Sequence, residues 1–192
     1  CKSSYLVNQV EESLNRLGIK QLEAILLHNS NDLLTSNKDQ IYEGLLKCKE
    51  LKLVRKIGIS SYSSADVLNI LNYFDLDIVQ LPYNVLNRDL LENNALDKIK
   101  CKDVEIHVRS IFLQGLLLMN KKEINNYFLK WEKLWQKWFN WLSINNLTPL
   151  EACLKFAIQT NEIDKIIVGV ESSKHLEEII QTCFSNNNLY FP

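Results

Sequence analysis

The sequence lacks the features that mark several specialised classes of protein. No apolar run approaches the roughly 18 residues that a membrane-spanning helix needs, and residues 1–4 show no signal-peptide pattern. Neither sign of charge is in excess: the sequence has 22 lysine and arginine residues and 23 aspartate and glutamate residues. Without an overall basic field, the chain would not be drawn onto nucleic acid or an anionic membrane. We therefore expect a cytoplasmic protein that binds a small molecule.

Paired cysteines are also missing. The sequence has an odd number of cysteines, none in Cys-x-x-Cys spacing: Cys1, Cys48, Cys101, Cys153 and Cys183. This pattern favours reduced thiols, buried among apolar side chains, over a disulfide framework or a zinc site. No metal site is predicted.

The sequence does contain enough apolar material, 46% of its residues, for the core of one globular domain over residues 1–192. Apolar runs rich in Ile, Val and Leu alternate with longer segments of helical period, which is typical of βαβ units with a parallel sheet. The runs 25–27 and 166–168 are apolar on both faces, which predicts strands covered on both sides. The predicted strands are 22–28, 56–60, 76–81, 104–110 and 164–170.

Helices are predicted where side chains can cap the amides of a first turn. Residues 36–39 (SNKD) should precede one helix and residues 63–66 (SSAD) another, and Thr148-Pro149-Leu150-Glu151 has the pattern of a capping box. The opening helix, 7–17, is closed by Gly18. The chain therefore opens on a helix, and the other helices fall between the predicted strands, as βαβ units require.

A Trp-rich helical insert is predicted at about residues 120–146. Its tryptophans, at spacings of four, three and three, share one helical stripe: Trp131, Trp135, Trp138 and Trp141. Such a stripe could line a sugar or nucleotide site, but it more often packs against the rest of the fold or a partner. The polar run 185–188 is expected to be a mobile tail.

Polar residues follow every predicted strand. The carboxyl ends of parallel strands converge, so these residues are expected to gather at one site. Taken singly, a strand-end serine is also a common turn residue, His28 could equally be a satisfied core imidazole, and His107, inside its strand, looks structural. In chain order they are His28 and Asn29, Ser60 and Ser61, Gln80 with Tyr83 and Asn84, Arg109 and Ser110, and, led up to by Gly169, Ser172, Ser173 and Lys174.

Six segments also resemble one enzyme family in their order and spacing. They are SLNRLG at 13–18, LLH at 26–28, KIGIS at 56–60, QLPYN at 80–84, SIFLQGLL at 110–117, and IVG at 167–169 with LEE at 176–178. In these segments the chain resembles the C-terminal portion of an aldo-keto reductase. The resemblance implies an α/β fold of the (β/α)8 TIM-barrel type, here incomplete. About five parallel strands are expected, with the first three βα units absent, because such a barrel normally needs about 250 residues.

The resemblance also implies roles for these residues, with NADP, or else NAD, as the cofactor. His28 falls where the family orients the substrate carbonyl, and Ser60 and Gln80 fall where the nicotinamide carboxamide is held. Arg109 takes the place of a group that packs on the nicotinamide, and the loop 172–174 suits a phosphate. The implied cofactor-binding set is Ser60, Ser61, Gln80, Arg109, Ser110, Gly169, Ser172, Ser173, Lys174, His175 and Glu178.

Three positions depart from the family pattern. Ser61 stands where the family often has asparagine, and His175 where an arginine commonly binds the 2′-phosphate. Ile179 stands where an asparagine commonly touches adenine. The departures at His175 and Ile179 leave the choice between NADP and NAD open.

Of the Asp, Tyr, Lys and His tetrad that the family uses, only His28 can be assigned. Lys2 and Tyr5 are poor substitutes, because no apolar strand precedes Lys2 and Tyr5 stands at the entry to a helix. We expect a parent enzyme that reduces aldehydes or ketones with NAD(P)H, a chain that is inactive alone, and self-association through open barrel edges.

Two alternatives stay open. One is a non-catalytic barrel remnant that binds a nucleotide or a protein partner. The other is a different phosphate-binding barrel enzyme, such as an isomerase, which would use the loop 172–174 but not the remaining strand-end residues.

Overall fold

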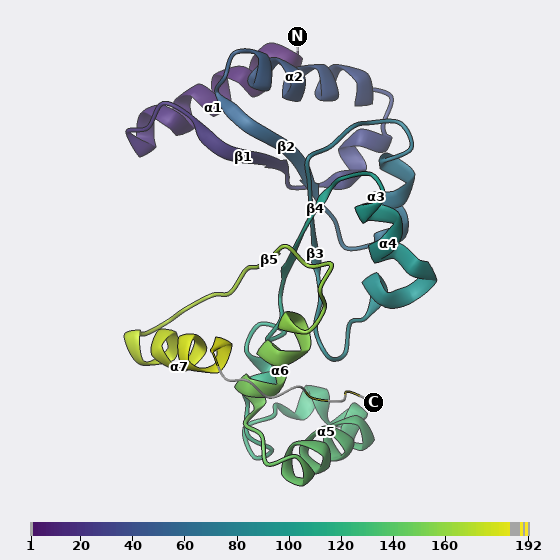
Figure 1. Ribbon diagram of the computed structural model, residues 1–192, viewed down its shortest axis with the longest axis vertical. Coiled ribbons are helices and arrows are strands. Elements are labelled where there is room, and N and C mark those ends of the chain that lie inside the picture. The colour runs from purple at the N-terminus through teal and green to yellow at the C-terminus, as the bar shows by residue number, and fades with distance from the viewer. Residues whose placement is uncertain (1, 185–188, 190, 192) are drawn as a thin grey trace. The chain divides into compact units, whose positions relative to one another are not determined.

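The computed structural model describes residues 2–184, 189 and 191, so the predicted tail at 185–188 lies outside the described residues. The fold is α/β with five parallel strands in the sheet order β1-β2-β3-β4-β5, as predicted (Figure 1). The strands are β1 (Leu22–Leu27), β2 (Val54–Ser60), β3 (Ile78–Pro82), β4 (Glu105–Arg109) and β5 (Lys165–Ile166). The α-helices are α1 (Lys2–Leu17), α2 (Lys38–Glu50), α3 (Ser64–Ile70), α4 (Ala95–Lys100), α5 (Glu132–Ile144), α6 (Pro149–Ile158) and α7 (Ser173–Cys183).

The chain forms two compact units. The first comprises Cys1–Pro82 with Asp89–His107, and the second comprises Tyr83–Arg88 with Val108–Pro192. Short 3-10 helices complete them: η1 (Ser30–Leu34) and η2 (Asp89–Asn94) in the first, η3 (Leu116–Leu118) and η4 (Asn126–Trp131) in the second. Within the described residues, no helix has the length and apolar character to cross a membrane.

In the first unit, α1 and α2 pack side by side next to β1 and β2 (Figure 1). Val10 and Leu14, one helical turn apart in α1, are buried, and the helix ends at Gly18, whose φ of +66° is left-handed. The Ser63 hydroxyl accepts from the Asp66 amide and caps α3, as predicted. Asn37 precedes α2 without a side-chain cap, so the expected cap there is wrong.

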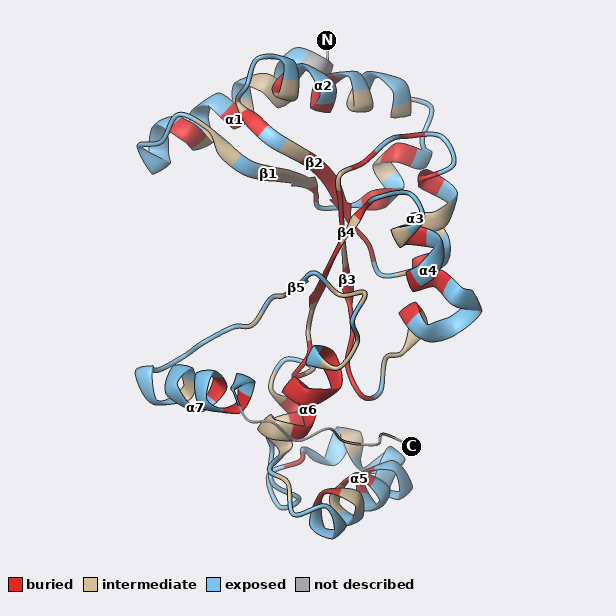
Figure 2. Cartoon of the chain, viewed as in Figure 1, coloured by how far each residue is buried: buried red, intermediate tan, exposed pale blue. Residues whose placement is uncertain are grey.

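The core of the first unit lies between these helices and the sheet, where β2 and β3 are largely buried (Figure 2). Gly58 allows the strands to come together, because it pairs with Leu26 on one side and Ile78 on the other. An added Cβ at Gly58 would stand 2.1 Å from the Ile78 carbonyl oxygen. Fully buried side chains of this core include Leu33, Leu45, Ile57, Ile59, Ile70 and Ile78.

The second unit is built around α6. The Thr148 hydroxyl accepts from the Glu151 amide while the Glu151 carboxylate accepts from the Thr148 amide, which confirms the predicted capping box. Every residue from Ala152 to Ala157 is buried, so this short helix is enclosed on all sides. Phe156 stacks on Tyr83 with ring centroids 4.8 Å apart.

The predicted insert is helical, and most of its tryptophan stripe is packing surface. Trp135 and Trp138 are buried, and Trp138 stacks on half-buried Trp141. Trp131, at the end of η4, is 44% exposed and is the exception.

Two predictions about burial are wrong. β5 spans two residues rather than 164–170, and Ile167 and Val170 beyond it are exposed. In β1, Leu27 is buried but Ile25 and Leu26 are only half-buried, so the run 25–27 is not fully covered on both faces as predicted. Cys48 and Cys153 are buried as expected, but Cys101 and Cys183 are exposed because they lie at the ends of α4 and α7.

Candidate functional site

In the first unit, three of the predicted site residues fall in one row across the sheet. Ser60 pairs with Gln80 in the parallel register of β2 and β3. Leu27 pairs with Ile59, so the next residue, His28, continues the same row beside Ser60. Neighbouring strands lie about 4.8 Å apart, which brings the three residues within reach of one small ligand. Ser60 is buried, Gln80 half-buried and His28 exposed, so the row opens to solvent at His28.

Ser61, also predicted to bind cofactor, is held by the protein itself. Its amide donates to the Gln80 carbonyl at 2.9 Å, and its hydroxyl accepts from the Ser30 hydroxyl at 3.1 Å. The same hydroxyl contacts the backbone of Ser63, donating to its carbonyl and accepting from its amide. Ser61 therefore fixes the loops that follow β1 and β2, and so fixes the place of Ser60.

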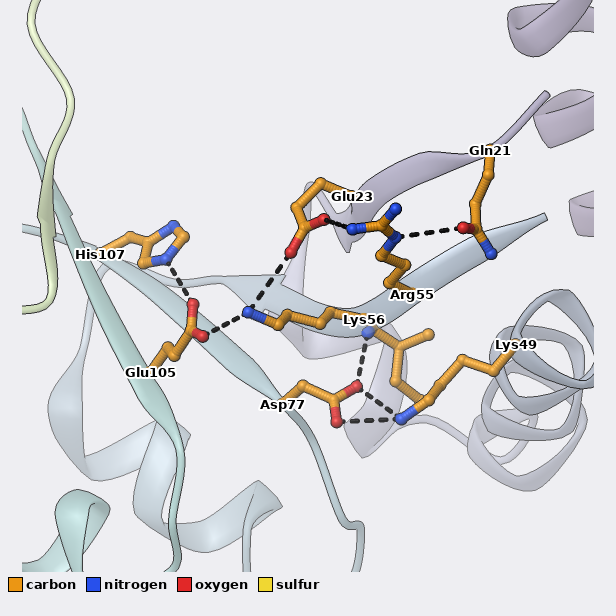
Figure 3. A network of polar contacts seen from close by, with 9 residues as sticks. Gln21, Glu23, Lys49, Arg55, Lys56, Asp77, Glu105 and His107 are labelled. Atoms are coloured by element: carbon orange, nitrogen blue, oxygen red, sulfur yellow. Dashed lines mark hydrogen bonds and ion pairs between the residues drawn. The ribbon is translucent and has the colours of Figure 1, made fainter. Parts of the chain in front are cut away.

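A charged network lies on β2 and β4 of the first unit (Figure 3). Lys56 forms ion pairs with Glu105 and, at 3.4 Å, with Glu23, and the Glu105 carboxylate lies 3.1 Å from Nε2 of His107. The hydrogen bond that Lys56 donates to Glu105 is the largest of the effects that raise the pKa of Lys56 above its ordinary value. Lys56 is four residues before Ser60 on the same strand, so strand alternation places both on one face of the sheet. His107 is buried within its strand, in agreement with the structural role expected for it.

The carboxylate of Asp77 links the sheet of the first unit to α2, close to this network. Both oxygens of Asp77 accept from Nζ of Lys49, at 2.9 and 2.8 Å, and one of them also accepts from the Ile57 amide at 2.7 Å (Figure 3). Asp77 thus ties β2 and the residue before β3 to one helix.

In the second unit, Arg109 and Ser110 end β4 at a tight turn. Ser110 has a left-handed φ of 59°, and its carbonyl oxygen accepts from the Leu113 amide at 2.9 Å. The same oxygen accepts from the side-chain amide of Asn84 at 3.1 Å. Asn84 is buried, and the sequence places it among the polar residues at the end of the third predicted strand, but its bond to Ser110 was not predicted.

This turn lines a cavity of about 720 Å³ in the second unit. Of the predicted residues, Ser110, Gly169 and His175 lie in its wall. Nε2 of His175 is buried and has no hydrogen-bond partner in the described part of the chain, so the site has an unsatisfied polar atom to offer a ligand. Wall residues that the sequence did not single out include Phe112, Gln114, Met119, Glu123 and Glu171.

The remaining predicted residues lie at the beginning of α7. The Ser172 hydroxyl accepts from the His175 amide at 3.1 Å and caps the helix. Lys174 is strongly exposed and reaches Glu178 only at 3.9 Å, so its ammonium group is weakly held. Ile179 faces the other way and is buried, which explains why an apolar residue stands at this position.

The predicted residues therefore form two sets. The first unit brings together His28, Ser60, Ser61 and Gln80 at the carboxyl ends of β1 to β3. The second carries Arg109, Ser110, Gly169, Ser172, Ser173, Lys174, His175 and Glu178 on β4, the loop after β5 and α7.

Comparison of the chain with known proteins identifies its family. The family model described as Aldo/keto reductase family matches residues 1–189. The chain belongs to the aldo/keto reductase family. This aldo/keto reductase chain is 30% identical over 112 residues to the NADH-specific methylglyoxal reductase of Escherichia coli, covering 57% of the chain and 33% of that protein. It is 33% identical over 84 residues to an uncharacterised oxidoreductase of Schizosaccharomyces pombe, covering 44% of the chain and 27% of that protein.

Solved structures of aldo-keto reductases share the fold. The holo form of an aldo-keto reductase from Bacillus halodurans matches with a TM-score of 0.78 at 19% identity, over 96% of this chain and 60% of that one. A glycerol dehydrogenase of Gluconobacter oxydans matches with a TM-score of 0.66 at 14% identity, over 94% of this chain and 64% of that one. The aldo/keto reductase chain thus spans about a third of the first curated relative and about three fifths of the Bacillus structure.

Proposed function

We propose that this chain carries the cofactor-binding and carbonyl-orienting residues of an oxidoreductase that reduces aldehydes or ketones with NADPH, or else NADH. The observation that supports this best is the row formed by His28, Ser60 and Gln80 across three adjacent strand ends. The family uses the same positions to orient the carbonyl and to hold the nicotinamide. A different phosphate-binding enzyme would have no use for this row.

Each residue of the row has a group suited to its proposed role. Ser60 and Gln80 offer donors and acceptors that match the two polar atoms of a carboxamide. His28 lies exposed at the end of the row, where its imidazole can donate to a substrate carbonyl oxygen. The bound nicotinamide would supply the hydride, and the protein's part is to orient the two reactants.

The second set suits the phosphate-bearing part of the same class of cofactor. The first-turn amides of α7 and the weakly held ammonium group of Lys174 both attract anions. The cavity beside them offers the unpartnered Nε2 of His175, which can bond a hydroxyl or a phosphate oxygen. Glu171, also in the wall, disfavours a 2′-phosphate and so favours NAD, whereas the ammonium group of Lys174 favours the extra phosphate of NADP. We propose NADP as the cofactor and test NAD beside it.

Binding of the cofactor is tested by titration. NADPH and NADH are each titrated into the purified chain while nicotinamide emission, excited by transfer from tryptophan, is recorded. The Gln80→Ala variant should bind about tenfold more weakly, because one polar partner of the carboxamide is lost. Gln136→Ala is the matched control, since Gln136 is exposed on α5 and bonds only Glu132 among the described residues. A wild-type chain that binds neither nucleotide would overturn the proposal.

Turnover separates the proposed reductase from a non-catalytic relative. Of the tetrad, the residues of this chain supply only His28, so we propose that the chain alone binds cofactor without reducing a carbonyl. Loss of the proton donor and its lysine removes many orders of magnitude in rate. Steady oxidation of NADPH in the presence of a simple aldehyde would contradict this. A chain that binds a protein partner and ignores nucleotide would support the barrel remnant instead.

Two finer points of the proposal concern assembly and location. We propose that copies of the chain associate through the outer edge of β1, which has no strand partner among the described residues. Size-exclusion chromatography with light scattering should show a species larger than 22.4 kDa, and a stable monomer would contradict association.

A cytoplasmic location is consistent with the four free cysteines that the structure describes, and cell fractionation tests it.

A further inference from the structure

A buried amide beside the proposed cofactor site is not explained by packing. Asn84 is 1% exposed and lies two residues after β3. Its side-chain oxygen accepts from the Leu86 amide at 3.0 Å and from the Asn87 amide at 2.9 Å. These two bonds close the turn that follows β3, and they need only an acceptor. A carboxylate would satisfy them equally well.

The other half of the amide reaches a different segment of the chain. Nδ2 of Asn84 donates to the carbonyl oxygen of Ser110 at 3.1 Å. That oxygen also accepts from the Leu113 amide, which is the first bond of the turn beyond β4. The side chain thus links the loop after β3 to the loop after β4. An amide can do this because its oxygen accepts and its nitrogen donates, whereas a carboxylate of the same shape can only accept.

The turn that Asn84 holds is strained. Ser110, Leu113 and Gln114 all have left-handed φ values, of 59°, 48° and 55°. Residues other than glycine adopt this region at a cost, and they keep it only where their surroundings impose it. Ser110 and Gln114 line the cavity of the second unit. A carbonyl fixed by Asn84 therefore fixes the shape of that wall.

We propose that Asn84 is a positioning residue: by donating to the Ser110 carbonyl, it holds the turn at 110–115 in the form that binds the cofactor. Asn84 acts through Ser110 and does not itself touch the ligand. The expected effect on cofactor binding rests on the proposed function. The effect of Asn84 on the conformation of the turn at 110–115 can be measured without any ligand.

The test uses Asn84→Asp, which keeps the acceptor for Leu86 and Asn87 and removes the donor to Ser110. Amide hydrogen exchange, followed by mass spectrometry or NMR, should speed up at Leu113 by about tenfold or more and stay unchanged at Leu86 and Asn87. Titration with NADPH should show about tenfold weaker binding. A merely structural role would lower the melting temperature without separating the two sets of amides.

Asn125→Asp is the control, because it makes the same change of charge in the same unit at a side chain whose bond within the described residues is one that it accepts, from the Tyr127 amide. It should alter neither Leu113 exchange nor NADPH binding. If Asn84→Asp does not fold, Asn84→Ser is measured in its place, because serine is too short to span both loops.

Unchanged exchange at Leu113, or NADPH binding within twofold of wild type in a chain that binds it, would overturn the positioning role. If the wild-type chain binds no nicotinamide cofactor, the proposed function fails. Faster exchange at Leu113 in Asn84→Asp would then still show that Asn84 holds the turn.

Discussion

Replacing Gly58 with alanine is expected to open the sheet of the first unit at the point where it carries the candidate site. A Cβ there would lie 2.1 Å from the Ile78 carbonyl oxygen, 2.9 Å from the Ile78 carbonyl carbon and 2.6 Å from Cδ2 of Leu26. A leucine methyl can rotate away, but the backbone of β3 cannot move without lengthening its hydrogen bonds to β2. The strain therefore falls on the pairing of β2 with β3.

The cost should exceed that of ordinary overpacking in a core, which is about 1–3 kcal/mol. We expect at least about 3 kcal/mol, which for a chain of this length lowers the melting temperature by roughly 6–12 °C. Ser60 and Gln80 are paired two residues further along the same strands, so any nucleotide binding should weaken as well. Thermal unfolding followed by circular dichroism, with NADPH titration at a temperature where the variant is folded, measures both effects.

Gly169→Ala is the matched control. Nothing lies within 4 Å of an added Cβ at Gly169, and its φ is not left-handed. Its melting temperature should stay within about 2 °C of wild type. A Gly58→Ala chain as stable as Gly169→Ala would show that β2 and β3 do not approach each other as described.

Three further predictions concern caps, thiols and charge. Thr148→Ala should destabilise α6 by about 1 kcal/mol in urea unfolding, while Thr148→Ser, which keeps the hydroxyl, should cost much less; equal losses would refute the capping box. Iodoacetamide should label Cys101 and Cys183 well before Cys48 and Cys153, because burial raises the pKa of the Cys153 thiol to about 12 and that of Cys48 above its ordinary value; peptide mass spectrometry gives the order, and early labelling of Cys153 would contradict it. Because the pKa of Lys56 is raised in the folded state, its ion pairs stabilise the fold below its unfolded pKa of 10.5, and this stabilisation is lost as the pH rises through the folded pKa. The difference in free energy of unfolding between wild type and Lys56→Gln should therefore shrink as the pH is raised through that range. A constant difference would refute a stabilising role for the ion pairs of Lys56.

The parts of the fold that could be predicted are those set by local sequence. The Thr148 capping box, the Ser63 cap and the Gly18 helix end depend on residues within one turn of each other. β2 and β3 were also predictable, as short runs rich in Ile, Val and Leu between segments of helical period. Their pairing then places Ser60 beside Gln80 without further information.

What failed depends on neighbours that the sequence does not name. Residues 166–168 have the pattern of a buried strand, but β5 has one strand partner among the described residues and ends at Ile166. The thiols of Cys101 and Cys183 are exposed because each lies at the end of a helix, and the cysteine pattern alone does not indicate where a helix ends. The hidden polar atom of His175 and the two-sided bonding of Asn84 arise from contacts between distant segments, and no local pattern signals them.

The most direct test of the central claim, that the strand ends of this aldo/keto reductase chain bind a nicotinamide cofactor, is a footprint of NADPH by amide hydrogen exchange over the whole chain. We predict slower exchange at residues 60–61 and 80–81 in the first unit and at 110–115 and 172–176 in the second. Residues 40–50 of α2 and 134–144 of α5, which carry none of the proposed cofactor-binding residues, should not change. Exchange unaltered at the strand ends under saturating NADPH and NADH, or protection confined to those two helices, would contradict the account.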